Sequence, residues 1–236
     1  MPSWIGQALH RGILTTHYPR EAATESEVPP TGRPPVPNAG AASLAAAAST
    51  CPVGAITELS IDQGRCVRCA RCLARGFSFA GPVESATLDR QELRTFPSPP
   101  PANSPADTGR LRELGRSLHV FMIDVGSCNA CNLEVLALAN PFYDSQRLGI
   151  FFTNSPRHAD VLLVVGTPTA EMTDPLRRAY EALPAPKAVV AAGACPISGG
   201  VFAGTPGLPG PIADILPVDI FIPGCPPTRY SSWTAS

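Results

Sequence analysis

Short apolar runs alternate with amphipathic segments along the second half of the chain. Each run is bounded by polar residues or glycine and has the length of a strand, so strands are predicted at 118–124, 148–153, 159–166, 187–192 and 218–223. Helices are predicted near 129–139 and 172–183. A wholly apolar strand such as 161–165 is typical of a parallel sheet that is buried on both faces. The alternation predicts an α/β fold, with a parallel sheet between layers of helices.

The first half has a different pattern, in which proline-rich and alanine-rich stretches flank a small cysteine-bearing unit. Residues 1–27 are predicted to form an amphipathic helix and a following segment, because apolar residues recur there at helical spacing, at Trp4, Ile5, Leu9, Ile13 and Leu14. That helix would pack on its own domain or lie against a partner subunit or a membrane surface. Residues 28–96 are expected to form a small α+β domain. The proline-rich residues 97–110 would be a semi-rigid linker to the sheet domain at 111–236.

Composition and charge narrow the class of protein. The chain has 236 residues, of which 44% are hydrophobic and 16% charged, so it can build a packed core. Its net charge of -1 gives no electrostatic reason to expect nucleic acid as a partner. No apolar run approaches the roughly 20 residues that cross a bilayer, and the N-terminus lacks a signal-peptide pattern. We therefore expect a cytoplasmic chain whose cysteines bind metal and do not form disulfides.

Four of the eight cysteines follow predicted strands of the sheet domain. Cys128 and Cys131 come after the first strand, Cys195 after the fourth and Cys225 after the fifth. Because ligands of open α/β sheets bind beyond the carboxyl ends of the strands, we expect these thiols to converge there and to hold a [4Fe–4S] cluster. Glycines that would let the backbone approach such a cluster lie beside them, at Gly126, Gly193, Gly199, Gly200 and Gly224. A structural zinc site and buried inert cysteines are the alternatives.

The other four cysteines match half of a two-cluster ferredoxin, and they are Cys51, Cys66, Cys69 and Cys72. Bacterial ferredoxins contain two C-x2-C-x2-C-x3-C-P runs, and the last cysteine of each run binds the cluster of the other run. With Cys51 as the last cysteine of a first run, the ligand positions without cysteine are Ala41, Leu44, Ala47 and Gly76. All four of those positions belong to one cluster, whereas the surviving cysteines belong to the other. We therefore predict one deleted cluster and one complete [4Fe–4S] site, since zinc has no reason to preserve this crossed pairing.

The motifs around the second cysteine set resemble one known family. They are Asp124-Val-Gly-Ser-Cys-Asn-Ala-Cys-Asn-Leu-Glu134, Asn140-Pro-Phe-Tyr-Asp144, Ser155-Pro-Arg-His-Ala-Asp160 and Ile222-Pro-Gly-Cys-Pro-Pro227. This part is similar to the small subunit of group 4, formate-hydrogenlyase-type [NiFe] hydrogenases, a family homologous to the 20 kDa subunit of complex I. The resemblance implies a flavodoxin-like sheet domain whose cluster lies next to a nickel–iron centre in a separate large subunit. The spaced pair Cys128-Asn-Ala-Cys131 resembles the hydrogenase branch, because the complex I subunit typically has two adjacent cysteines.

The first half resembles the ferredoxin-like subunit that lies beside the small subunit in the same complexes, so the chain has the pattern of a natural fusion of the two. The resemblance implies an electron-transfer subunit of an oxidoreductase that is not active alone and carries two [4Fe–4S] clusters. Its partners would be a large catalytic subunit, membrane subunits that hold it at the inner face of the cell membrane, and another electron-transfer protein. The alternatives are the small subunit of a complex-I-like NADH/quinone oxidoreductase, a free-standing ferredoxin-type carrier and a zinc-stabilised interaction protein.

Two further expectations concern residues beside the cysteines. We expect no catalytic residue in the chain, although family resemblance makes Glu134 a candidate member of a proton route at the subunit interface. The alternative for Glu134 is a carboxylate favoured by the dipole near a helix N-terminus. Arginines crowd the first cysteine set, and they would form a solvated face, raise the potential of its cluster or dock an acidic donor. They are Arg65, Arg68, Arg71 and Arg75.

Overall fold

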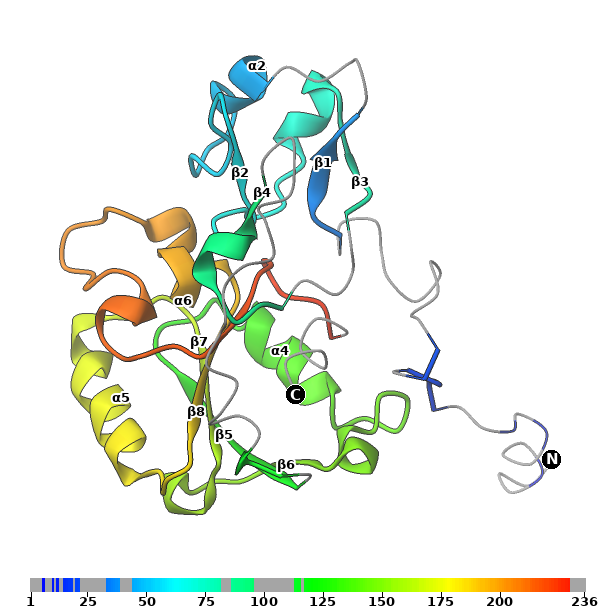
Figure 1. Cartoon of the computed structure of the whole chain (residues 1–236), viewed down its shortest axis with the longest axis vertical. Coiled ribbons are helices and arrows are strands. Elements are labelled where there is room, and N and C mark those ends of the chain that lie inside the picture. Colours follow the sequence, from blue (N-terminus) through cyan, green and yellow to red (C-terminus); the bar gives the residue numbers. More distant parts are fainter. Residues whose placement is uncertain are drawn as a thin grey trace.

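A five-stranded parallel sheet forms the core of the second half (Figure 1). The computed structural model describes Gly6, His10, Gly12 and residues 15–18, 20–21, 33–38, 44–81, 86–95, 113–115 and 117–229. The strands are β5 (Leu118–Asp124), β6 (Ile150–Phe152), β7 (Val161–Val165), β8 (Ala188–Ala192) and β9 (Ile220–Ile222). Their order in the sheet is β6-β5-β7-β8-β9, and every pairing is parallel. This is the flavodoxin-like order, so the predicted α/β fold is confirmed, with a strand at each of the five predicted positions.

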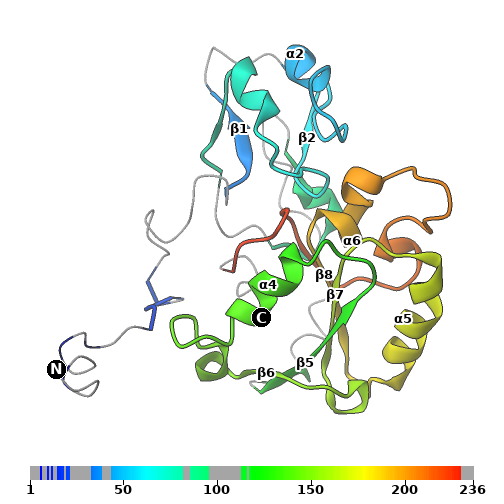
Figure 2. The ribbon, with the colours of Figure 1, turned by 180° about the vertical axis from the view of Figure 1, so that it is seen from behind.

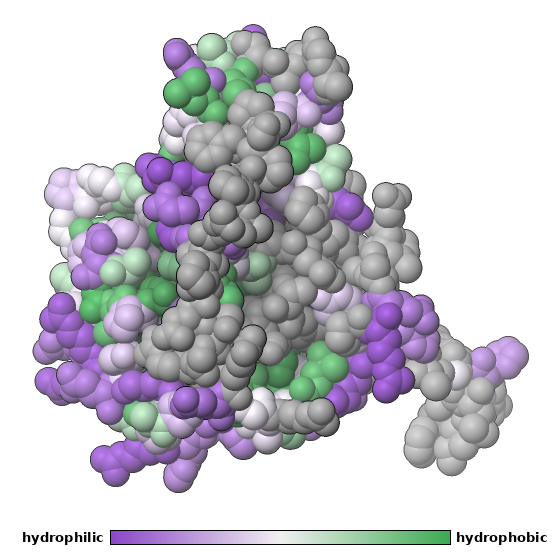
Figure 3. Space-filling view, in the orientation of Figure 1, coloured by the Kyte–Doolittle hydropathy of each residue, from purple (hydrophilic) through white to green (hydrophobic). Residues whose placement is uncertain are grey.

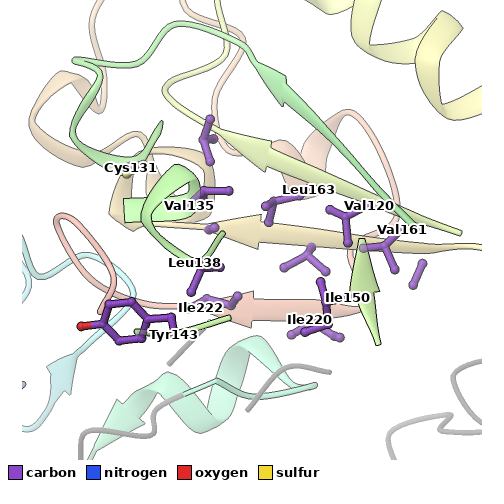
Figure 4. Packing of buried hydrophobic residues seen from close by; sticks show 14 of the residues in the cluster. Val120, Cys131, Val135, Leu138, Tyr143, Ile150, Val161, Leu163, Ile220 and Ile222 are labelled. Carbon is purple, nitrogen blue, oxygen red and sulfur yellow. The ribbon is translucent and has the colours of Figure 1, made fainter. Parts of the chain in front are cut away.

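Helices cover both faces of the sheet, as Figures 1 and 2 show from opposite sides. Helix α4 (Ala130–Ala137) packs on one face, and α5 (Ala170–Ala182) and α6 (Ala194–Ser198) lie on the other. Successive side chains of a strand point to opposite faces, so β7 supplies Val161, Leu163 and Val165 to the α4 side. Its remaining residues pack on the α5 side. Figure 4 shows Val135 and Leu138, on the α4 side, packed over the strands.

The first half forms a smaller unit at the top of Figure 1. Strand β1 (Pro35–Pro37) pairs antiparallel with β3 (Phe77–Phe79), and β2 (Ile61–Asp62) pairs antiparallel with β4 (Arg94–Thr95). Helix α2 (Leu44–Ala48) and the 3₁₀ turn Arg71–Arg75 lie between these strands in sequence, and a second 3₁₀ turn spans Arg90–Leu93. The order strand, helix, hairpin bridge, helical turn and strand is that of a ferredoxin-like α+β unit.

The core of this smaller unit is small. Its buried residues are Ala47, Ile56, Ile61, Cys72 and Phe77. Leu44 packs against them, so two of the positions where the deleted cluster would have had ligands now contribute to an apolar core; Ala41 lies outside the described residues. Hydrophobic and hydrophilic residues lie side by side on its surface at the top of Figure 3, and Leu59 and Leu73 are among the exposed hydrophobic side chains.

Residues 86–95 connect the two units. Thr87 and Phe221 exchange backbone hydrogen bonds of 3.0 and 2.8 Å, which adds a bridge at the β9 edge of the large sheet. Leu93 is buried in one cluster with Ile197 of α6 and Phe221. Gly64 lies against the same contact, and it has no room for a side chain there, because a Cβ atom would lie 2.8 Å from Cγ2 of Ile197. Ile197 is therefore a packing residue between the two units.

The N-terminal residues 15–18 pack on the sheet domain and not on the smaller unit. The Thr16 N–H donates to the carbonyl of Phe142 at 2.8 Å. Tyr18 is buried in the cluster on the α4 side of the sheet, and the Arg147 guanidinium donates to the carbonyls of Thr16 and Tyr18. The apolar residues of the predicted N-terminal helix and the predicted linker at 97–110 lie outside the described residues.

Candidate metal centre

The second cysteine set lies at the carboxyl end of the parallel sheet, as predicted. Cys128 and Cys131 follow β5, Cys195 lies in α6 directly after β8, and Cys225 follows β9. Strand β5 borders the point where the strand order reverses, which is where ligands bind in sheets of this topology. All eight cysteines of the chain are free thiols.

Asp124 holds the loop that carries Cys128. Its Oδ1 accepts hydrogen bonds from the N–H groups of Gly126 and Ser127 at 2.9 and 2.7 Å. Its Oδ2 accepts from the Ser127 hydroxyl at 2.7 Å and from Asn132 at 2.6 Å. Burial disfavours ionisation of Asp124, but these hydrogen bonds outweigh burial and hold its pKa below the ordinary value. The ionised carboxylate therefore joins the end of β5 to the first turn of α4.

Two glycines leave room for the thiols of the second set. A Cβ atom at Gly193 would lie 3.0 Å from Sγ of Cys131, and one at Gly200 would lie 2.9 Å from Sγ of Cys195. Both glycines have positive φ, at 108° and 57°, which disfavours other residues there in any case. The backbone therefore approaches the ligand sulfurs more closely than a residue with a side chain would allow.

Charge interactions show that the second set is gathered in one place. Burial, together with smaller contributions from Cys195, Cys225 and Cys128, raises the pKa of Cys131 to about 12. Burial likewise raises the pKa of Cys225, with contributions from Cys195 and Cys128. Every thiol–thiol interaction of these two cysteines is with a member of the second set.

The first set is gathered in the same way, around a small cavity. The walls of that cavity include Cys51, Cys66, Cys69 and Cys72. Burial raises the pKa of Cys66 to about 11, with Cys72 and Cys51 contributing, and burial also raises the pKa of Cys72. The Ala55 N–H donates to Sγ of Cys51 at 3.3 Å, and the Arg68 N–H donates to Sγ of Cys66 at 3.4 Å.

Arg68 lies within electrostatic reach of both sets. Burial lowers the pKa of its guanidinium, whereas negative charge on Cys66 and Cys225 opposes this effect. Because the interaction between charges weakens with distance, the two cysteine sets must lie near each other for the Arg68 guanidinium to act on Cys66 and on Cys225. Arg71 and Arg75 are instead exposed, which fits the solvated face expected of such arginines.

Glu134 makes an ion pair with a residue that the sequence did not single out. Arg229 donates from Nε to Oε2 of Glu134 at 2.6 Å and from NH2 to Oε1 at 3.2 Å. No local pattern predicts this pair, because its members are 95 positions apart. Asp124 had a recognisable signal, since an aspartate before Val-Gly-Ser at a strand end is typical of side-chain-capped turns.

The donor chemistry of the two cysteine sets fits iron–sulfur clusters. Each set offers four thiols, which is the number that holds a [4Fe–4S] cluster, together with backbone N–H groups or glycine positions close to sulfur. Within the described part of the chain, no group of three or more His, Cys, Asp or Glu side chains is arranged to hold a metal ion, so the support for clusters is the number and type of the donors and not a formed coordination shell. Among the described residues, no helix is both long and apolar enough to cross a membrane.

Comparisons with known proteins agree with the sheet domain and its motifs. Residues 128–235 match the family model described as NADH ubiquinone oxidoreductase, 20 Kd subunit. The membrane-bound hydrogenase subunit mbhJ of Pyrococcus furiosus is 47% identical over 114 residues, which span 48% of this chain and 68% of that protein. Formate hydrogenlyase subunit 7 of Escherichia coli is 44% identical over 118 residues, 50% of this chain and 46% of that protein.

Two further comparisons broaden the group. One subunit of the F(420)H(2) dehydrogenase of Methanosarcina mazei is 43% identical over 107 residues, 45% of this chain and 57% of that protein. A chain of an archaeal membrane-bound sulfane sulfur reductase complex is 30% identical with a TM-score of 0.47, over 52% of this chain and 68% of that chain. The protein therefore belongs to the NADH ubiquinone oxidoreductase 20 Kd subunit family, as the motifs around its second cysteine set predicted.

Proposed function

We propose that this chain is an electron-transfer subunit of a membrane-associated oxidoreductase, in which two [4Fe–4S] clusters relay electrons to or from a separate catalytic subunit. The observation that carries the proposal is the division of eight free thiols into two gathered groups of four. No cysteine is left over for a nickel centre, so catalysis would be completed by the partner.

The chain's own residues would hold the clusters and control their surroundings. The first cluster would be held by Cys51, Cys66, Cys69 and Cys72, and the second by Cys128, Cys131, Cys195 and Cys225. When bound, each cluster supplies a centre that takes up and passes on one electron. The N–H groups of Ala55 and Arg68 donate to ligand sulfur, and such hydrogen bonds stabilise the reduced, more negative state. The Arg68 charge would favour electrons at both sites, since it acts on a thiol of each set.

A surface near the second set is suited to a partner subunit. Leu133 and Leu136 of α4 are 59% and 62% exposed, although α4 begins beside Cys128. Val201 and Phe202 are 61% and 50% exposed, and they follow the helix that contains Cys195. Exposed apolar side chains next to two cysteine-bearing segments of the second set support a docking surface for the catalytic subunit.

The relatives and the cysteine spacing support a [NiFe] hydrogenase of the formate-hydrogenlyase type. Two of the relatives are a membrane-bound hydrogenase subunit and a formate hydrogenlyase subunit. The pair Cys128-Asn-Ala-Cys131 resembles that branch. A complex-I-like quinone reductase is the second candidate, and the dehydrogenase subunit from Methanosarcina mazei supports it. In either complex, the chain would lie at the inner face of the cell membrane through its partner subunits.

Isolation of the native complex tests this proposal. An affinity tag on this chain, used on membranes dissolved in mild detergent, is expected to recover a large subunit together with nickel. Addition of H2 should then reduce both clusters, as followed by electron paramagnetic resonance. A complex without nickel that reduces quinone would favour the second candidate. Recovery of a stable, monodisperse single chain with no partner would contradict the proposal in favour of a free-standing carrier.

A further inference from the structure

The Glu134–Arg229 ion pair joins two ligand-bearing segments of the second set. Glu134 lies in α4, three residues after Cys131, and Arg229 lies four residues after Cys225. The two guanidinium–carboxylate hydrogen bonds, of 2.6 and 3.2 Å, form a fork that fixes both distance and orientation. The side chains of Arg229 and Glu134 are 34% and 25% exposed, so the pair is partly shielded from water.

Tyr143 ties this fork to the core of the sheet domain. Arg229 donates from NH1 to the Tyr143 hydroxyl at 3.1 Å, and its guanidinium lies 5.1 Å from the centre of the tyrosine ring. The ring belongs to the buried cluster on the α4 side, and Figure 4 shows its hydroxyl pointing away from the strands. Asn140 fixes the turn below it, because its Oδ1 accepts the N–H groups of Phe142 and Tyr143 at 2.9 and 3.0 Å.

We propose that Arg229, held between Glu134 and Tyr143, is a positioning residue that fixes the Cys225 loop against the Cys131 helix. This inference rests on the proposed function, because it concerns how the second ligand set is kept in register. The four thiols of that set come from three separate segments of the chain, so their geometry depends on contacts between those segments. The Arg229–Glu134 ion pair is such a contact, because Glu134 lies three residues after Cys131 and Arg229 lies four residues after Cys225.

The same geometry argues against a proton route through Glu134. Both carboxylate oxygens accept hydrogen bonds from one guanidinium, so protonation would break the ion pair. Burial opposes the charge on Arg229, but its hydrogen bonds to Glu134 and Tyr143 raise its pKa above the ordinary value. The Arg229 cation therefore persists as the partner of both carboxylate oxygens of Glu134.

Variants of the cluster-loaded full chain test the inference. Arg229→Met and Glu134→Gln are each expected to change the resonance signal of the second cluster. Each should also speed its loss of iron to a chelator roughly tenfold, the factor equivalent to about 1.4 kcal/mol. The double variant should be no worse than Arg229→Met alone, because that single change already removes the interaction with Glu134. Arg229→Lys should be only partly better than Arg229→Met, since an ammonium cannot form the fork. The signal of the first cluster should not change in any of them.

Asp174→Asn with Arg178→Met is the matched control. That pair is also ionic, at 3.8 Å, but it is 75% and 81% exposed on α5 and touches no ligand segment, so both signals should stay as they are.

The inference is overturned if Arg229→Met leaves the second signal and the iron-loss rate unchanged. It is equally overturned if Glu134→Gln alone lowers proton-linked activity of the complex while both cluster properties stay intact. Where Arg229→Met does not fold, the exchanged pair Glu134→Arg with Arg229→Glu must restore part of the iron retention that each single exchange loses. An unmodified chain that binds no iron at all would instead refute the proposed function.

Discussion

The two cysteine sets are held by very different amounts of structure. The second set is attached to a five-stranded sheet whose two faces carry large clusters of buried side chains. The first set is attached to two-stranded sheets and to a core cluster that has five buried members among the described residues, one of which is the candidate ligand Cys72. A sheet with both faces covered can fold without a cofactor, whereas a unit with so small a core needs further stabilisation. The comparison indicates that the first cluster would maintain its unit, and that the second would be added to a domain that folds without it.

The two units are not independent, because they share a buried contact. Leu93 and Ile197 pack together beside Phe221, and Gly64 has no room for a side chain against Ile197. Gly64 lies two residues before Cys66, and Ile197 lies two residues after Cys195. The contact that joins the units is therefore also one that holds the two cysteine sets near each other.

Ligand replacement should give the largest effect and separate the two regions most clearly. Cys72→Ser and Cys195→Ser are each expected to remove about four iron atoms per chain and to leave the signal of the other cluster. Only Cys72→Ser should also expose the amides of residues 44–81 to rapid hydrogen exchange, because that unit loses its main stabilising group. Protected amides in 44–81 without the first cluster would show that the small unit folds unaided. Loss of both signals in either variant would mean that the halves fold as one domain.

Replacement of Gly200 tests whether the second site needs the close approach of the backbone to Cys195. Gly200→Ala places a methyl group 2.9 Å from Sγ of Cys195 by the present geometry, so the second cluster should be lost or distorted. Gly204→Ala is the control, since Gly204 also has positive φ but a Cβ atom there meets nothing within 4 Å. Both changes should strain the backbone by roughly 1–2 kcal/mol, and only the first should alter iron content and the resonance signal. Equal effects would mean that backbone strain alone matters at Gly200.

Truncation of Ile197 tests the contact between the units. Ile197→Ala should lower the free energy of unfolding by about 2–5 kcal/mol and speed hydrogen exchange in residues 86–95. It should also weaken the magnetic interaction between the two reduced clusters, because the units would no longer be held in one arrangement. Ile212→Ala removes a buried side chain from the α5-side core instead, and it should destabilise the chain without these two effects. Unchanged magnetic interaction in Ile197→Ala would contradict the role of this contact.

Ionisation of the buried thiols should have a smaller effect, which appears in how the free energy of unfolding of the cluster-free chain depends on pH. Burial raises the pKa of Cys66 from 9.0 to about 11, so the folded chain keeps a proton that the unfolded chain releases. That stabilisation is fully present below about pH 9 and is lost as the pH rises through about 11. At about 1.4 kcal/mol per pKa unit, Cys66 accounts for at most about 3 kcal/mol. Denaturant titrations of the cluster-free chain and of its Cys66→Ala variant measure the difference, and equal pH profiles would show that this thiol is not shifted.

The sheet domain could be predicted from the sequence because its signals are local. The apolar run Val161–Val165 has the length and composition of a buried strand, and cysteines placed after predicted strands must converge if the strands are parallel. The pairs Arg229–Glu134 and Gly64–Ile197 could not be predicted, since they join residues that only the tertiary fold brings together. The docking of residues 15–18 on the sheet domain was missed for the same reason.

Iron and labile sulfide in the chain purified without oxygen are the most direct test of the central claim. Two sets of four thiols predict about eight iron and eight sulfide per chain, with a spectrum of two [4Fe–4S] clusters. Four iron per chain would contradict one of the two sites, and stoichiometric zinc in place of iron would contradict the electron-transfer role of the set that binds it.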